Sequence, residues 1–66
     1  MRRFPTASEV ERMAEELTVR PRLPSDLARA TRMPFLRATA ALKALRYQNR
    51  AVRFQGQGWA VRRDRA

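Results

Sequence analysis

The sequence predicts a single α+β domain that is mainly helical, with three helices followed by a C-terminal two-stranded β-hairpin. Two observations support this fold class. Apolar residues recur with a helical period up to about residue 50 and then alternate with a period of two. The chain has 66 residues, which is the length of one domain. We therefore treat 1–66 as one domain, with helices at 6–18, 24–31 and 34–50 and a hairpin at 52–62.

A capping box opens the first predicted helix. Thr6 is followed three residues later by Glu9, so each side chain can bond to the other residue's backbone amide. Apolar residues then recur on one stripe, at Val10, Met13, Ala14 and Leu17. The acidic residues Glu9, Glu11, Glu15 and Glu16 fall mostly off this stripe. Beside Arg12 and without burial, they indicate a solvated face and not a pair of catalytic carboxylates.

The second helix follows an extended connector. Pro21 and Pro24 keep 19–23 extended, where it could supply a short edge strand. Pro24 suits the first turn of the next helix, because its missing N–H has no helical partner there. Asp26 then lies near the positive end of the helix dipole. The inner face is expected to consist of Leu27, Ala28 and either Ala30 or Thr31.

Arg32 and Met33 form a turn, after which Pro34 opens the third helix. On a helical wheel one face holds Phe35, Ala38, Leu42, Leu45 and Asn49, with Ala41 beside them and facing the preceding helix. We expect this face, including Phe35, to lie in the core. The opposite face holds Leu36, Arg37, Ala40, Lys43, Ala44 and Tyr47.

The period changes at the end of the chain. Val52 and Phe54 alternate with polar residues, a four-residue turn follows at 55–58, and Trp59 and Val61 alternate again. An isolated hairpin is unstable, so we expect Phe54, Trp59 and Val61 to form one apolar face that covers the helices. Trp59 could instead stack on a base, but its place in this alternation favours the core.

The charge is unevenly distributed. The net charge is +9, and residues 1–26 hold five basic and five acidic side chains, whereas residues 27–66 hold ten basic and one acidic. A sign asymmetry of this kind favours a polyanionic partner, of which nucleic acid is the commonest. The alternative is a generally arginine-rich surface without a specific partner.

Several classes of function are excluded by composition. Cys and His are both absent, which removes disulfides, thiolate chemistry and the usual zinc sites. Without His, Ser8 and Ser25 cannot form a serine triad. We expect no enzymatic activity, no cofactor or metal, and no small-molecule ligand. No stretch is apolar enough to span a bilayer, so we expect a cytoplasmic, nucleoid-associated protein without a membrane partner.

The order of elements resembles the winged helix-turn-helix family over roughly 6–62. The resemblance is carried by the run 23–28 entering the second helix, the turn 31–33, and the residues 56–61 of the wing. Ala28 matches a small residue where two helices cross, and Ala38, followed by Leu42 and Leu45, matches a buried residue early in the recognition helix. The family often has Gly in the tight turn, where this chain has Arg32.

The resemblance implies sequence-specific binding of double-stranded DNA, in the manner of a small prokaryotic or phage transcriptional regulator. The third helix would enter the major groove, and the wing would contact the backbone. Leu36 and Ala40 would touch thymine methyls, Arg37 a guanine, Lys43 a guanine or a phosphate, and Tyr47 a phosphate. The expected DNA contacts are Arg29, Arg32, Leu36, Arg37, Ala40, Lys43, Tyr47, Arg53, Gln57 and Arg62.

Alternatives stay open for these residues. Leu36 and Tyr47 could pack on the first helix or on a partner, and the arginines could be merely solvated. The same face could make the chain an adaptor for a polymerase or another acidic protein, and RNA is a third possible partner. A homodimer is consistent with a domain so small that it covers only half a DNA site.

Overall fold

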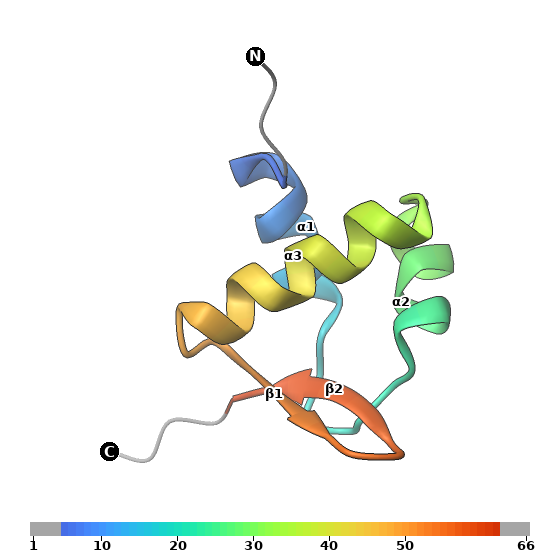
Figure 1. The fold of residues 1–66 in the computed structure, drawn as a ribbon, viewed down its shortest axis with the longest axis vertical. Helices are drawn as coiled ribbons and strands as arrows, with labels where there is room; N and C mark the ends of the chain where they lie inside the picture. The colour runs from blue at the N-terminus through green and yellow to red at the C-terminus, as the bar shows by residue number, and fades with distance from the viewer. Residues whose placement is uncertain (1–4, 63–66) are drawn as a thin grey trace.

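The computed structural model describes residues 5–62 as three helices followed by an antiparallel hairpin (Figure 1). The helices are α1 (Ala7–Glu16), α2 (Pro24–Thr31) and α3 (Phe35–Tyr47), and the strands are β1 (Ala51–Phe54) and β2 (Gly58–Val61). The mainly helical α+β fold expected from the sequence is confirmed. In Figure 1, α3 crosses in front of α1 and α2, and the hairpin lies at one end of the helices. None of these helices is long and apolar enough to cross a membrane.

The capping box of α1 forms as the sequence predicts. The Glu9 amide donates to Thr6 Oγ1 at 3.1 Å, and the Thr6 amide donates to Glu9 Oε1 at 3.0 Å. The helix ends at Glu16, earlier than the expected residue 18, because Leu17 is already extended with ψ 142°. From there the chain turns toward the hairpin, where the Val61 amide donates to the Thr18 carbonyl at 2.8 Å.

A left-handed residue closes the turn between α2 and α3. Arg32 has φ 61° and ψ 37°, its amide donates to the Arg29 carbonyl, and the Met33 amide donates to the Ala28 carbonyl at 2.9 Å. This pair of bonds is a Schellman motif, which normally places glycine at the left-handed position. An arginine there costs about 1–2 kcal/mol relative to ordinary backbone. The turn also carries Met33 into the core.

The connector between α1 and α2 pairs with the free edge of the hairpin. Arg22 and Trp59 form an isolated bridge, in which the Arg22 amide donates to the Trp59 carbonyl at 3.0 Å and the Trp59 amide donates back at 2.7 Å. β2 therefore lies between β1 and the connector. Gly58 makes this approach possible, because it has φ +115° and any Cβ there would overlap the Arg22 carbonyl group.

The register of the hairpin places Phe54 on a different face of the sheet from the one that the sequence predicts. Phe54 pairs with Gly58, and Arg53 pairs with Trp59, so the loop has three residues and not four. Residues directly opposite one another share a sheet face, and a shift of one residue exchanges the faces. Trp59 consequently faces the core at 6% exposure, whereas Phe54 lies on the outer face and is 46% exposed. The prediction that both cover the helices is wrong for Phe54.

The core lies between the three helices and the inner face of the hairpin. Its fully buried large side chains are Met13, Leu27, Leu42 and Leu45. Phe35 is not among them: it is 53% exposed, which contradicts its predicted place in the core. As the first residue of α3 it lies at the edge of the apolar face, and Met33 is the residue that reaches the core at this end.

The C-terminal end of α3 also differs from the prediction. The helix ends at Tyr47 instead of residue 50, and Asn49 has φ 64°. The Arg50 amide donates to the Leu45 carbonyl at 2.8 Å, and the Asn49 amide donates to the Arg46 carbonyl, which forms a second Schellman motif. Asn49 therefore belongs to the closing turn and is exposed, because asparagine tolerates the left-handed conformation that the turn requires.

Candidate nucleic-acid interface

The solvent face of α3 consists of residues directly opposite its buried side. Ala38, Ala41, Leu42 and Leu45 are completely buried. On the other side Leu36 is 74% exposed and Tyr47 is 90% exposed, with Lys43 exposed and Ala40 half-buried between them. These four residues lie where the sequence places them. They form a continuous strip along the helix, which we call the α3 strip: Leu36, Ala40, Lys43 and Tyr47.

Arg37 does not lie on this strip, contrary to the prediction. Its Nε donates to Glu9 Oε2 at 2.6 Å, and its Nη2 donates to Glu9 Oε1 at 3.3 Å. Positions 37, 41 and 44 share one side of the helix, and Ala44 packs against the core instead of lining the outward face. Arg37 and Ala44 therefore belong to the flank that faces α1, and the guanidinium is held by a carboxylate 28 positions earlier in the chain.

Two of the carboxylates on α1, Glu9 and Glu11, have lowered pKa values because each binds an arginine. The hydrogen bond from Arg37 lowers the pKa of Glu9, and the Thr6 amide lowers it further. Arg50 binds Glu11 through both terminal nitrogens at 2.8 and 3.1 Å, which lowers the pKa of Glu11 and raises that of Arg50. Both carboxylates are therefore ionised at neutral pH and neutralise part of the excess positive charge.

A shallow groove with cationic walls lies on the opposite flank of α3. It is lined by Pro24, Thr39, Lys43, Arg46, Arg53 and Trp59. Lys43 and Arg46 are three residues apart on the helix and thus neighbours on its surface. Arg53 comes from β1, and it joins them because it lies opposite Trp59 on the sheet face turned toward the helices. We call Lys43, Arg46 and Arg53 the basic groove.

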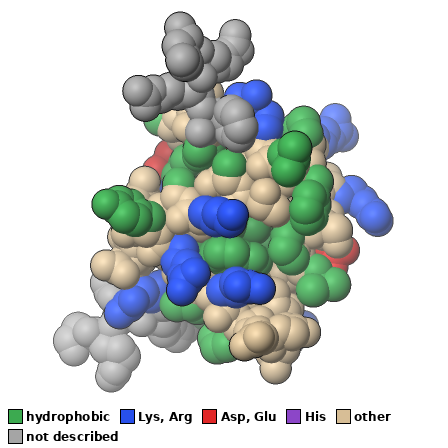
Figure 2. Space-filling model, in the orientation of Figure 1, with side chains coloured by type: hydrophobic (Ala, Val, Ile, Leu, Met, Phe, Trp, Pro, Cys, Tyr) green, Lys and Arg blue, Asp and Glu red, His purple; other side chains and the backbone are tan. Residues whose placement is uncertain are grey.

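The basic groove has no carboxylate in its lining. Within residues 5–62, its three cations make no ion pair, whereas Arg22, Arg37 and Arg50 are each paired with a glutamate at 3.2 Å or less. Figure 2 shows Lys and Arg side chains gathered over α3 and the adjoining hairpin, with no acidic side chain among them. Three arginines are thus neutralised by glutamates of α1, while the cations of the basic groove make no ion pair within the described residues.

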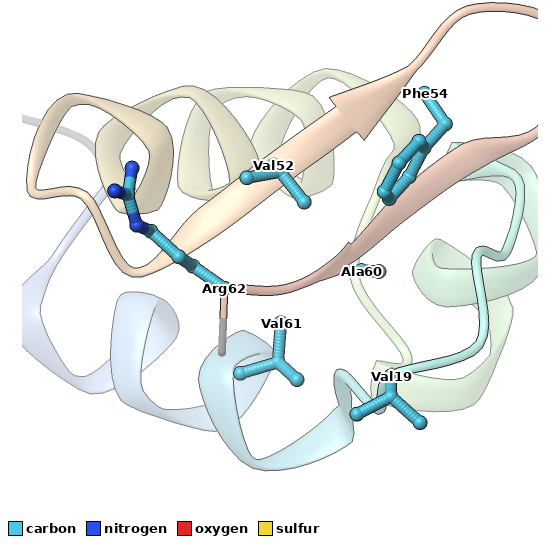
Figure 3. A pocket seen from close by; sticks show the side chains of 6 residues that line it. All are labelled: Val19, Val52, Phe54, Ala60, Val61 and Arg62. Carbon is cyan, nitrogen blue, oxygen red and sulfur yellow. The ribbon is translucent and has the colours of Figure 1, made fainter. Parts of the chain in front are cut away.

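The remaining sequence-predicted residues lie outside the lining of this groove. Arg29 and Arg32 are exposed at the end of α2, and Gln57 is exposed in the hairpin loop. Arg62 lies on the outer side of the sheet, because its amide bonds to the Arg50 carbonyl and places it in line with Val52. Figure 3 shows Arg62 with Val19, Val52 and Phe54 around a separate apolar hollow. Arg62 is therefore not part of the basic groove.

Arg46 is a member of the groove that the sequence did not single out. On the helical wheel Arg46 lies close to Phe35. Because Phe35 was expected to be buried, this flank of the helix was not predicted to be exposed to solvent. The spacing contained a usable signal, since Thr39, Lys43 and Arg46 follow one another at four and three residues and so share a flank.

The described residues offer no metal site, since no three acidic side chains gather among 5–62. What the geometry provides is the exposed α3 strip, small or apolar at Leu36 and Ala40, next to three cations that make no ion pair within 5–62. Comparison of the chain with family models, with curated proteins and with solved structures finds no match in any of the three.

Proposed function

We propose that this chain binds double-stranded DNA, with the α3 strip in the major groove and the basic groove on the phosphate backbone. The observation that carries the proposal is the set of three uncompensated cations, Lys43, Arg46 and Arg53, brought together from α3 and β1. Cations that neutralise phosphates release condensed counterions, and this release supplies much of the affinity of DNA-binding proteins.

The shape of α3 supports the same proposal. The major groove is about 12 Å wide and admits one helix, provided that the outward face is not too bulky. Ala40 keeps the α3 strip thin between Leu36 and Lys43, so the helix axis can approach the base edges there. The basic groove flanks this strip on the hairpin side, which is where one DNA backbone would lie. Arg29 and Arg32 are exposed at the end of α2, and we expect them to add further phosphate contacts.

The experiment compares two triple variants that lose the same charge. The first, Lys43→Gln/Arg46→Gln/Arg53→Gln, removes the basic groove, and the second, Arg22→Gln/Arg37→Gln/Arg50→Gln, removes the arginines paired with glutamates. Three lost phosphate contacts weaken duplex binding by about a hundredfold at about 0.15 M salt. We expect this loss, in a fluorescence anisotropy titration, for the first variant only, and a few-fold loss at most for the second.

Equal losses in the two variants would contradict the proposal, because binding would then depend on total charge and not on the basic groove. Wild-type protein that fails to bind duplex DNA would reject it altogether. A duplex RNA of the same sequence serves as a competitor, since its deep, narrow major groove excludes a helix. Competition as strong as that of DNA would show that the α3 strip does not enter a major groove.

Sequence-specific regulation of transcription, in the manner of a small prokaryotic or phage factor, is the more detailed form of the proposal. It predicts that selection from a random duplex pool enriches a defined site. Two enriched half-sites separated by one helical turn, about 34–36 Å, would further indicate a homodimer. A pool that remains random would reduce the function to non-specific DNA binding.

A second candidate function rests on the exposure of Tyr47 at 90% and Leu36 at 74%. Exposed aromatic and aliphatic side chains beside cations also suit an adaptor that docks an acidic protein. The two functions differ in what removes binding. Tyr47→Ala should abolish capture of such a protein and weaken DNA binding by only a few-fold, while the triple variant of the basic groove should do the reverse.

A further inference from the structure

The N-terminal half of α3 is unusually poor in polar groups that could read a base. We propose that this half of the helix recognises the C5-methyl groups of pyrimidines in the major groove, so that the protein prefers thymine-rich duplexes. This inference rests on the proposed DNA-binding function and specifies what its reading surface selects. In helix-turn-helix complexes the first residues of the recognition helix contact the base edges.

The two polar side chains in these turns are already engaged. Arg37 binds Glu9 through Nε and Nη2 at 2.6 and 3.3 Å. The hydroxyl of Thr39 donates to the Leu36 carbonyl at 2.9 Å. The Nε and Nη2 donors of Arg37 and the hydroxyl hydrogen of Thr39 are therefore not offered to a base in this arrangement. The first polar side chain of the strip is that of Lys43, two turns after the start of the helix.

The most exposed side chains of the first two turns are apolar. Leu36 is 74% exposed and Phe35 is 53% exposed, and Ala40 lies one turn beyond Leu36 on the same side. On the floor of the major groove the apolar feature of the four natural base pairs is the thymine methyl group. The occupant that suits an apolar strip beside cations is thus a polyanion that carries methyl groups, which describes an A·T-rich duplex.

The test removes the methyl groups without changing the base pairing. Wild-type protein is titrated with an alternating adenine–thymine duplex and with the same duplex carrying uracil for thymine. Burial of one methyl-sized group is worth about a fourfold change in affinity, so we expect uracil to weaken binding about fourfold for each methyl contacted. A guanine–cytosine duplex with and without 5-methylcytosine provides the opposite arm, in which added methyl groups should strengthen binding.

The assignment to Leu36 is tested by Leu36→Ala, which should lose most of its sensitivity to the methyl groups. Leu36 is exposed on a helix and alanine is the strongest helix former, so this substitution leaves the fold intact. The matched control is Val19→Ala, an aliphatic side chain 60% exposed in the connector between α1 and α2, which should keep the full sensitivity.

Equal affinity of the wild type for the thymine and uracil duplexes would overturn the inference while leaving DNA binding intact. Undiminished sensitivity in Leu36→Ala would overturn it as well, since the methyl groups would then be read elsewhere. Absence of binding to every duplex would reject the proposed function itself, so the two failures are distinguishable.

Discussion

The two flanks of α3 both have basic side chains nearby, but these are paired with carboxylates on one flank and not on the other. On the α1 side, Arg37 and Arg50 lie within hydrogen-bonding distance of Glu9 and Glu11. On the hairpin side, Lys43, Arg46 and Arg53 gather without a carboxylate in the groove that they line. The comparison shows that net charge alone does not locate a binding surface. Glutamates of α1 neutralise Arg37 and Arg50, whereas the three cations of the basic groove gather where no carboxylate lines the surface.

The largest expected effect concerns the hairpin that carries Arg53. Gly58→Ala would place a Cβ against the Arg22 carbonyl at a positive φ, so we expect it to lower the free energy of unfolding by about 2–4 kcal/mol. Gly56→Ala is the control: its φ is +83° but nothing lies within 4 Å, so we expect a loss of only about 1 kcal/mol. Urea unfolding measures both. Similar losses would show that the bridge to the connector does not hold the hairpin in place.

A pair of single substitutions sharpens the contrast between the flanks. Lys43→Gln should weaken DNA binding about fivefold at about 0.15 M salt, the share of one phosphate contact, and leave the melting temperature unchanged. Arg37→Gln should lower the melting temperature, because it breaks the ion pair with Glu9, and change DNA affinity by less than twofold. Anisotropy and thermal melting test the pair. The reverse pattern would indicate that Arg37 contacts DNA, as the sequence analysis expected.

Acidification should weaken the α1 flank selectively. The pKa values of Glu9 and Glu11 lie below the ordinary value of 4.5, so their ion pairs are fully present above that pH. Their stabilisation is lost as pH falls below 4.5 through the folded-state pKa values, where the native carboxylates take up protons. We expect the melting temperature of Glu9→Gln to fall less steeply with acid than that of the wild type. Glu15→Gln, which removes an exposed carboxylate from the same helix, should behave like the wild type.

The smallest expected effect is a gain in stability. Arg32→Gly relieves a left-handed conformation but makes the unfolded chain more flexible, so we expect a net gain of about 0.5–1 kcal/mol in unfolding free energy. If Arg32 contacts phosphate, the same variant loses DNA affinity several-fold. Asn49→Gly is the control, because asparagine already tolerates its φ of 64°. A stabilised Arg32→Gly with unchanged DNA affinity would remove Arg32 from the interface.

Local chemistry made much of the fold predictable. The capping box at Thr6, the proline that begins α2 and the apolar period of α3 each depend on residues a few positions apart, and each appears in the structure. The turn at Arg32 was also predictable from the order of elements, although a favourable residue is missing there. These features are determined by interactions within a single element or a single turn.

Long-range geometry was not predictable in the same way. The pairing of Arg37 with Glu9 joins positions 28 residues apart and depends on how α1 crosses α3. The face on which Phe54 lies depends on whether the hairpin loop has three or four residues. In the structure Gly58 is paired with Phe54 and is in close contact with the connector, so the loop has three residues. Of the candidate site, the α3 strip followed from helical period, whereas the basic groove required the register that places Arg53 beside α3.

The most direct test of the account is the salt dependence of duplex binding. Each phosphate contact contributes about −0.9 to the slope of log K against log salt. We expect Lys43→Gln/Arg46→Gln/Arg53→Gln to make this slope shallower by about 2–3, and Arg22→Gln/Arg37→Gln/Arg50→Gln to leave it unchanged. Parallel lines for the wild type and the first variant would show that the basic groove does not contact phosphates.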